Sequence, residues 1–162
     1  MPLNLDKIDL KLLMQLQSNA RISNQEISRK IHLSPNAVKA RIKRLEDEGY
    51  IEKYVTVLSK SKFNRNLECL TGVTLEYNNH SNLARFLDYV KDIPQVDRCY
   101  HVNNVFDFIL HIVAKDVKDY HNCLIGMLSK VNCVSRTTPF IIFKEIEGAN
   151  TIDLTEFLKR FK

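Results

Sequence analysis

The stretch from Ser34 to Ile51 constrains the fold most, because it contains the start, the body and the end of one short helix. Ser34 is a favourable N-cap residue, and Pro35 suits the first helical position, where its missing N–H costs nothing. Gly49 follows the predicted last turn, where a residue in the left-handed conformation commonly ends a helix. The sequence therefore predicts a helix that begins after Ser34 and ends before Gly49.

Two faces of this predicted helix differ in chemistry. Val38, Ile42 and Leu45 recur at helical spacing, which indicates a buried stripe. The other faces carry amide and basic side chains, namely Asn36, Lys39, Arg41, Lys43 and Arg44. A helix that reads the major groove of DNA needs one face for packing and another for base edges. A basic helix face is more often simply solvated, so the interpretation depends on the segment that precedes it.

A second helix is predicted just before the basic one. Ser23 and Glu26 form a capping-box pattern, and the helix should extend to about Ile31. A short connection then leads to the basic helix. Helix, short turn and basic helix is the arrangement of the helix-turn-helix motif, which we place over residues 24–43.

Two flanking segments complete this part of the chain. Residues 5–16 predict a first helix whose apolar side chains share one face, and Asp6 or Asp9 suits its first turn. Residues 50–58 are rich in β-forming side chains and predict a strand, or wing, against the helices. We therefore expect a winged helix-turn-helix DNA-binding domain over residues 1–58.

The positive charge of the chain is confined to the same region. Residues 1–62 contain 12 Lys and Arg against 7 Asp and Glu, whereas residues 63–162 contain 12 of each class. The whole net charge of +5 therefore belongs to the first part of the chain. A local basic surplus is typical of a domain that binds a polyanion, although it also serves solubility.

Composition disfavours several classes of protein. No apolar run approaches the ~20 residues of a membrane span, and charged residues from Asp6 to Lys11 interrupt any signal peptide. The cysteines are widely separated and form no C-x-x-C pair, so we expect reduced thiols in a cytoplasmic protein and no zinc site. His101, His111 and His121 lack tight ligand spacing, and we expect no metal there.

The second part of the chain alternates predicted strands and helices. We expect four strands, over residues 67–77, 96–102, 107–114 and 134–146, and two helices, over residues 81–91 and 117–131. The order βαββαβ predicts a ferredoxin-like domain, which makes the whole chain α+β. Both helices would cover one face of an antiparallel sheet, and the open face of such a sheet commonly pairs with another subunit.

Changes in pattern give the expected domain boundaries. We read the polar residues 59–66 as a linker and residues 67–148 as the second domain. Residues 149–162 carry apolar side chains from Leu154 to Phe161 at helical spacing, which predicts a short amphipathic helix. Its apolar face is too small to stand alone, so it must dock on its own chain or on a partner subunit.

Several motifs resemble one known family. The segments Ile22-Ser23-Asn24, Leu33-Ser34-Pro35, and Arg41 to Glu46 followed by Gly49-Tyr50-Ile51, resemble the Lrp/AsnC family of leucine-responsive, or feast/famine, transcription regulators. The opening Asp6-Lys7-Ile8-Asp9 is similar to that of the family. The resemblance extends over essentially the whole chain, including the βαββαβ half, which in this family is called the RAM domain.

The resemblance implies a function for each half. The N-terminal domain would bind double-stranded operator DNA, and RAM domains would pair into a homodimer and often assemble into an octamer. Many members bind a free amino acid between subunits, beside the turn that joins the second and third RAM strands. The matching turn positions here are Val102, Asn103, Asn104, Val105 and Asp107, and Thr137 and Thr138 would complete the pocket. The resemblance thus implies an amino acid effector and no cofactor.

Two positions depart from the family pattern. The family usually has glycine where this chain has Asn104. Asparagine also tolerates left-handed backbone, but its side chain occupies space near a ligand. Pro139 departs as well, and its missing N–H predicts an edge strand or a bulge. Asp107 and Thr137 match the family.

For DNA recognition we predict two sets of side chains on the basic helix. Those that would face the groove, where amides pair with adenine and lysines with guanine, are Pro35, Asn36, Lys39, Ala40 and Lys43. Those that would contact phosphates or orient the helix are Ser34, Arg41 and Arg44. Arg41 alternatively pairs within the protein, with Glu46 or Glu26. Useful specificity would require a dimer on a two-fold related site.

Three functions remain in competition. The main expectation is a sequence-specific transcription regulator modulated by an amino acid or a related small effector. The first alternative is a DNA-binding regulator without an effector, whose RAM domain only oligomerises, and Asn104 favours it. The second is an enzyme similar to the sirohaem decarboxylases, which look like the same fold and connectivity. The basic helix argues against an enzyme, as does the lack of a Walker loop or G-x-G-x-x-G turn.

Overall fold

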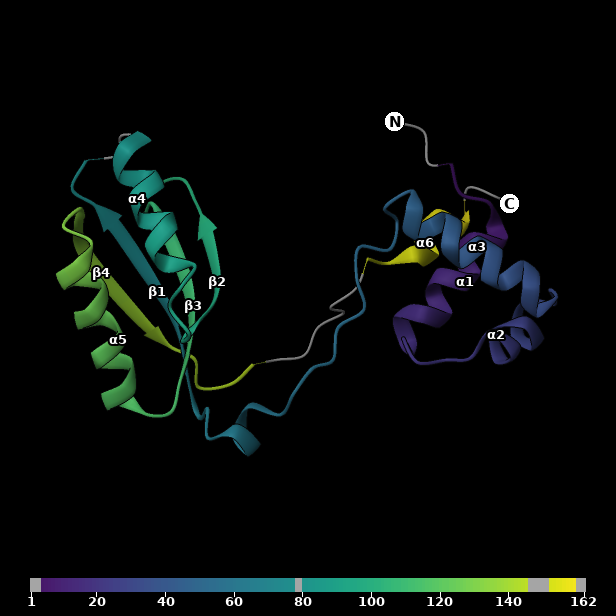
Figure 1. The fold of residues 1–162 in the computed structure, drawn as a ribbon, viewed down its shortest axis with the longest axis horizontal. Helices are drawn as coiled ribbons and strands as arrows, with labels where there is room; N and C mark the ends of the chain where they lie inside the picture. Colours follow the sequence, from purple (N-terminus) through teal and green to yellow (C-terminus); the bar gives the residue numbers. More distant parts are fainter. Residues whose placement is uncertain (1–3, 78–79, 146–151, 160–162) are drawn as a thin grey trace. The chain divides into compact units, whose positions relative to one another are not determined.

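The computed structural model describes residues 4–77, 80–145 and 152–159, and the chain divides into two compact units. One unit consists of residues 1–57 together with 147–162, and the other of residues 58–146. Each unit has its own hydrophobic core. Figure 1 shows that the first unit is helical and that the second contains a sheet.

Three helices build most of the N-terminal unit: α1 (Lys7–Ser18), α2 (Asn24–Ile31) and α3 (Pro35–Asp47). Asp6 and Asp9 form a reciprocal capping box, in which each carboxylate accepts the backbone N–H of the other residue. The helix predicted over residues 5–16 therefore begins after Asp6, at Lys7. The buried side chains of this unit are Leu5, Leu10, Leu12, Ile22, Ile27, Ile31, Val38 and Leu45.

The serine caps predicted for the starts of α2 and α3 are confirmed. The hydroxyl oxygens of Ser23 and Ser34 each accept a backbone N–H from the residue three positions on, at 3.2 Å. Gly49 has φ +75 just after α3, as expected of a residue that ends a helix in left-handed geometry. His32 has φ 56 and turns the chain between α2 and α3, a role for which the sequence offered no glycine.

The strand expected over residues 50–58 is wrong, because these residues form no strand. A strand is stabilised by pairing with a neighbouring edge, and none of the described residues of the N-terminal unit forms a strand that could offer one. Tyr54, Val55 and Val57 consequently remain largely exposed. Their β propensity alone does not produce a wing.

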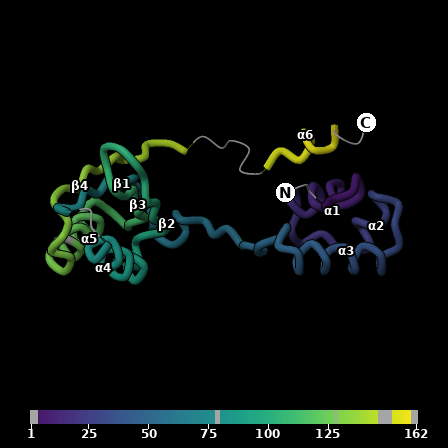
Figure 2. Tube along the Cα trace, turned by 90° about the horizontal axis from the view of Figure 1, so that it is seen from above, coloured from purple at the N-terminus to yellow at the C-terminus, as the bar shows by residue number. Residues whose placement is uncertain are grey.

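The second unit is a four-stranded antiparallel sheet with two helices on one face. Its main elements are, in chain order, β1 (Leu67–Leu75), α4 (His80–Val90), β2 (Val96–His101), β3 (Phe108–Ala114), α5 (Val117–Lys130) and β4 (Val134–Ile141). The strand order β2-β3-β1-β4 confirms the predicted βαββαβ fold. Figure 2 shows α4 and α5 on the same side of the sheet.

The two faces of this sheet differ in burial. On the covered face, Phe86 of α4 and Phe108 of β3 are fully buried, and their ring centroids lie 4.5 Å apart. On the other face, Leu70 lies opposite Phe140 in the β1–β4 register, and both remain partly exposed together with Tyr100 of β2. The open face therefore carries apolar side chains that this chain does not cover.

The last strand lies at the edge of the sheet. β4 pairs with β1 alone, so Pro139 occupies an edge position, which is one of the two placements predicted for it. The irregularity in the β1–β4 register lies between Thr74 and Leu75 rather than at the proline. β4 ends at Ile141, earlier than the expected limit at residue 146, which lies outside the described residues.

The residues read as a linker contain structure of their own. A 3-10 helix, η1 (Lys60–Phe63), lies within the second unit, and its Lys60 forms an ion pair with Glu68 of β1. Arg65 likewise pairs with Asp119 of α5, at 3.2 Å. The second unit starts at Leu58, so the residues read as a linker belong to it.

The described part of the predicted C-terminal helix is α6 (Leu154–Leu158), and it docks on the N-terminal unit of its own chain. Leu154, Phe157 and Leu158 pack against the core of that unit, and Figures 1 and 2 both show α6 beside α1. The expected apolar position Phe161 lies outside the described residues. Among the described residues, no helix has both the length and the apolar character needed to span a membrane.

Candidate nucleic-acid interface and effector pocket

The outer face of α3 presents polar and basic side chains to solvent. The exposed residues on this face are Pro35, Asn36, Lys39, Ala40 and Lys43. Val38 and Leu45, on the opposite face, are fully buried in the core. The structure therefore brings together on one accessible surface all the residues predicted to face the groove, while the other face anchors the helix. Their contact with DNA stays a prediction.

Ser34 lies at the N-terminus of α3, where backbone N–H groups and the helix dipole favour an anion. Its hydroxyl oxygen accepts the N–H of Ala37 and caps the helix. The neighbouring turn is fixed by two further bonds: Leu33 N–H donates to the carbonyl of Ser28, and the Ser28 hydroxyl donates to the carbonyl of Leu33. These bonds hold α3 at a defined angle to α2.

Arg41 and Arg44 turn away from the outer face toward α1. Arg41 Nη1 donates to Asp6 Oδ2 and to Asp9 Oδ1, each at 2.7 Å. Arg44 Nη2 donates to the second oxygen of Asp9. Asp9 is fully buried, so this carboxylate lies inside the unit with two guanidinium groups as its partners.

The predicted internal partners of Arg41 are corrected by these contacts. Glu46 instead accepts a hydrogen bond from the Tyr54 hydroxyl, at 2.9 Å, and Glu26 pairs with Lys30 of its own helix. Sequence reasoning offered Asp6 or Asp9 as a first-turn residue of the first helix and missed the ion pairs of Asp9. Nothing in the local pattern signals them, because the partners are 32 and 35 residues apart in the chain.

These contacts shift the pKa values of the charged groups. Burial raises the pKa of Asp6, but hydrogen bonds from the Asp9 N–H and from Arg41 outweigh burial and hold that pKa below its ordinary value. Hydrogen bonds to Asp6 and Asp9 raise the pKa of Arg41, and the bond to Asp9 raises the pKa of Arg44. Asp6 and both arginines are thus held in their charged forms.

The turn between β2 and β3 is tied to the end of β1. Val102 N–H donates to the carbonyl of Asp107, at 3.0 Å, and Asp107 N–H donates to the carbonyl of Val73, at 2.9 Å. The Asp107 carboxylate accepts the N–H of Leu75, at 2.7 Å. Asn104 has φ 93 within this turn, which agrees with the prediction that asparagine tolerates left-handed geometry here.

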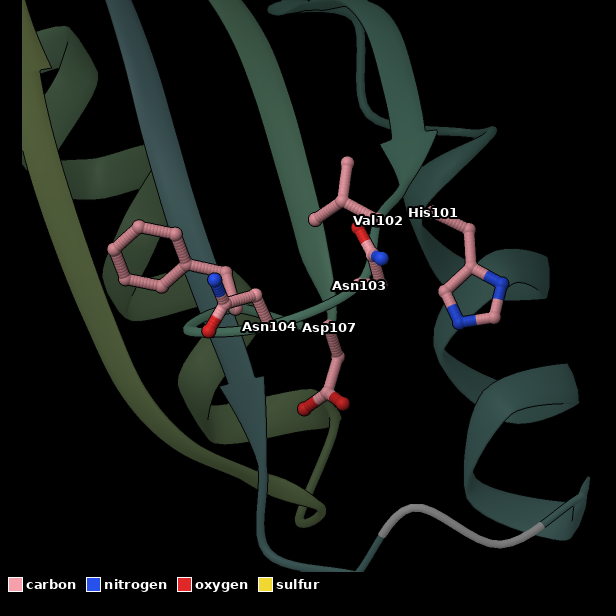
Figure 3. Close-up of a pocket in the computed structure, with 6 residues that line it drawn as sticks. His101, Val102, Asn103, Asn104 and Asp107 are labelled. Atoms are coloured by element: carbon pink, nitrogen blue, oxygen red, sulfur yellow. The ribbon is translucent and has the colours of Figure 1, made fainter.

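This turn borders a concave site of about 770 Å³. Figure 3 shows its labelled side chains spreading outward from the end of β2 and from the turn. The lining residues are His101, Val102, Asn103, Asn104, Phe106 and Asp107. The site therefore combines an imidazole, two amides and a carboxylate with apolar surface.

The structure brings together part of the predicted effector set. Val102, Asn103, Asn104 and Asp107 line the site, and His101 and Phe106 are additions that the sequence reading did not assign to it. Val105 points to solvent and does not line the site. Thr137 and Thr138 lie on β4, partly buried opposite Val73 and Gly72, and do not line it either.

Phe106 folds from the turn onto the sheet. Its ring lies so close to Gly72 that a Cβ added at that position would approach ring carbons to 2.7 Å. The same ring meets Phe140 of β4 edge-on, with centroids 6.1 Å apart. Thr138 pairs with Gly72 in the sheet register, so Phe106 links the turn to the strand that carries the predicted threonines.

The histidines of this unit contact other protein groups. His111 lies between two carboxylates, with Nδ1 3.0 Å from Asp97 and Nε2 3.0 Å from Glu68. His101 stacks on Phe108, with ring centroids 4.9 Å apart. Within the described parts of the chain, no group of three or more His, Cys, Asp or Glu residues has the arrangement of a metal site.

Known proteins match both halves of the chain. The family profile described as winged helix-turn-helix DNA-binding matches residues 5–52, and that described as Lrp/AsnC ligand binding domain matches residues 68–152. The transcriptional regulator AzlB of Bacillus subtilis (strain 168) is 33% identical over 156 residues, which cover 96% of this chain and 99% of that protein. The leucine-responsive regulatory protein of Escherichia coli (strain K12) is 28% identical over 149 residues, which cover 92% and 91%.

A solved structure supports the same comparison. The transcriptional regulator from Neisseria meningitidis determined as a complex with L-methionine has a TM-score of 0.88 and 27% sequence identity, and the match covers 95% of this chain and 99% of that one. A helix-turn-helix DNA-binding domain followed by a ligand-binding α+β domain defines a DNA-binding transcription regulator. The chain belongs to the Lrp/AsnC family of these regulators.

Proposed function

We propose that this regulator reads its operator through the exposed face of α3. Asn36 offers an amide to adenine, and Lys39 and Lys43 offer cations to guanine. Ala40 has a small side chain, so the helix backbone approaches the bases closely, and its methyl group suits thymine. The observation that carries this proposal is the joint exposure of these side chains on a helix whose other face is buried.

The helix start adds contacts that do not depend on base sequence. Ser34 and Pro35 lie at the N-terminus of α3, which favours a phosphate through its backbone N–H groups. Arg41 and Arg44 orient the helix on α1 through their ion pairs. A single unit reads only a short half-site, so specific binding requires two copies on a two-fold related operator.

Selection of genomic fragments by the purified protein tests this proposal. The expected result is a set of bound fragments that share a sequence with two related half-sites. Retention of fragments without any shared sequence, at an affinity equal to that for random DNA, would contradict sequence-specific binding. The fragments so obtained also supply the duplexes for measurements on variants.

For the second unit, we infer that the site beside the β2–β3 turn takes a free amino acid. An α-amino acid carries an ammonium group, which suits the Asp107 carboxylate, and a carboxylate, which suits backbone N–H groups of the turn. The concave site and its mixed polar and apolar lining support this assignment. The L-methionine complex of the Neisseria regulator shows that a similar protein binds an amino acid.

We also propose that two copies pair through the open face of the sheet. Leu70, Tyr100 and Phe140 leave apolar surface exposed there, and such surface is typical of a protein–protein interface. Thr137 and Thr138 then complete the effector site within the assembly, and dimers combine further into an octamer. Sedimentation velocity on the purified protein measures this assembly, and a monomer at micromolar concentration would contradict it.

One observation favours a regulator without an effector. Asn104 stands in the turn with φ 93, and its side chain lines the site that an amino acid would enter. In this alternative the second unit serves assembly only. The regulator itself would still bind operator DNA through α3.

Thermal unfolding with each of the twenty amino acids in turn separates the two possibilities. A ligand that binds the folded state raises the midpoint temperature of unfolding. At a ligand concentration 100 times its Kd, the folded state is stabilised by about 2.7 kcal/mol. A rise with one amino acid or a few supports the effector site. No rise with any of them, in protein that still binds its selected DNA, supports the alternative.

We propose that the protein acts in the cytoplasm and needs no cofactor. The relatives named above are transcriptional regulators, which supports a regulatory role rather than catalysis. A sirohaem-decarboxylase-like enzyme would bind a coloured tetrapyrrole. The absorption spectrum of the purified protein with added haem tests that alternative directly, and a stoichiometric shift of the haem band would support it.

A further inference from the structure

The basic side chains of α3 divide into two pairs with different surroundings. Lys39 and Lys43 are exposed on the outer face. Arg41 and Arg44 lie along the face toward α1, where their side chains are 28% and 39% exposed. Half of these basic groups are therefore already occupied by other protein groups before any nucleic acid binds.

One buried carboxylate holds both guanidinium groups. Asp9 Oδ1 accepts from Arg41 at 2.7 Å, and Asp9 Oδ2 accepts from Arg44 and from the backbone N–H of Asp6. Asp6 adds a second carboxylate to Arg41. The two arginines and two aspartates together carry no net charge, so this part of α3 offers little attraction to a polyanion.

A carboxylate that is fully buried is tolerated only where charged or hydrogen-bonding partners satisfy it. Removal of the Asp9 charge would leave two guanidinium groups without that partner, at positions that solvent already reaches. Arg44 would then be available to a phosphate, whereas Arg41 would keep its ion pair with Asp6. Arg44 Nε is buried without a hydrogen-bond partner among the described residues, and Arg44 Nη2 donates to Asp9.

We propose that Asp9 is a positioning residue for DNA recognition. Its carboxylate holds the side chains of Arg41 and Arg44 against α1 and away from the DNA phosphates. Non-specific attraction to DNA is thereby lowered, and binding depends more on the exposed face of α3. This inference rests on the proposed role of that face. It assigns the two arginines to orientation of the helix and excludes them from phosphate contact.

Salt dependence of binding to a short random-sequence duplex measures the number of phosphate contacts. Each contact contributes about 0.9 to the slope of log K against log salt concentration. In Asp9→Asn the slope should steepen by about 1, because Arg44 reaches a phosphate while Asp6 still holds Arg41. In Arg44→Gln the slope should stay at the wild-type value, because Asp9 already holds that group.

A double variant makes the test specific for positioning. Combining Arg44→Gln with Asp9→Asn should remove about 0.9 of the added slope, whereas the same Arg44→Gln change has no effect when Asp9 is present. A merely structural role of Asp9 would lower the unfolding midpoint and leave the slope unchanged. That result, or a lower slope in Arg44→Gln alone, overturns the inference.

Two further variants keep the result interpretable. Lys43→Gln should weaken binding to a duplex from the genomic selection if α3 faces DNA, so an unchanged affinity there indicates failure of the proposed interface rather than of Asp9 positioning. Where Asp9→Asn does not fold, as judged by circular dichroism, Arg41→Gln and Arg44→Gln decide the question by themselves. Unchanged slopes in both support the inference, and a reduced slope in either contradicts it.

Discussion

The carboxylate of Asp107 accepts the backbone N–H of Leu75 at 2.7 Å, and this bond joins the β2–β3 turn to the end of β1. The N–H of Asp107 donates in turn to the carbonyl of Val73. Leu75 is buried, so its N–H depends on this protein partner. The residue that the family resemblance assigned to the effector also holds the turn in place.

We therefore expect Asp107→Ala to lower the free energy of unfolding by about 1–3 kcal/mol, because a buried N–H loses its acceptor. Asp107→Asn keeps an oxygen at the same position and should cost less. Urea unfolding followed by circular dichroism measures both variants. Equal losses in the two would show that the hydrogen bond does not hold the turn.

Gly72 allows Phe106 to lie flat on the sheet. A Cβ at Gly72 would come within 2.7 Å of ring carbons, so Gly72→Ala should destabilise the protein by about 1–3 kcal/mol through overpacking. Gly126 of α5 is the matched control position, because a Cβ there would meet its nearest neighbour, Tyr89 Oη of α4, at an ordinary 3.8 Å. Gly126→Ala should be neutral or stabilising by up to about 1 kcal/mol.

The left-handed backbone at Asn104 predicts a difference between two small substitutions. Asn104→Ala should cost about 1–2 kcal/mol, because a Cβ with no compensating side-chain polarity is disfavoured at positive φ. Asn104→Gly should avoid that cost and enlarge the site. Asn103→Ala, on the neighbouring residue, should change stability by less than about 0.5 kcal/mol. Denaturant titrations of the three variants compare them, and equal effects would contradict this account of the turn.

The low pKa of Asp6 predicts a pH-dependent contribution to stability. Because the pKa is lower in the folded state than in the unfolded state, the Asp6 charge stabilises the fold above the unfolded value, roughly 3.9. That contribution disappears as the pH falls through the folded-state pKa. Asp6→Asn should thus reduce stability at neutral pH and converge with wild type in acid, since asparagine still caps α1. A constant difference across this range would refute the assignment.

Local chemistry made much of the fold predictable. Ser34, Pro35 and Gly49 act within a few residues of their own positions, so the limits of α3 follow from caps and backbone preference. The βαββαβ order follows equally from alternating apolar patterns. Burial of Val38 and Leu45 also fixes which side of α3 faces solvent, and the exposed face was predictable for that reason.

Features that depend on tertiary placement were not predictable. The ion pairs of Asp9 join residues on two helices, and helical spacing within either helix does not indicate them. The expected strand over residues 50–58 failed because propensity does not supply a pairing partner. Phe106 reaches the sheet only because Gly72 leaves room, a relation between segments far apart in sequence.

Affinity of Lys43→Ala for a duplex from the genomic selection, compared with a random duplex of equal length, tests the central claim most directly. Loss of a base contact should weaken binding to the selected duplex by about 1–3 kcal/mol. It should therefore lower the ratio of the affinity for the selected duplex to the affinity for the random duplex. Lys91→Ala, a change to an exposed lysine of the second unit, should leave the ratio unchanged. If Lys43→Ala binds both duplexes with the same affinities as the wild-type protein, the exposed face of α3 does not read the operator.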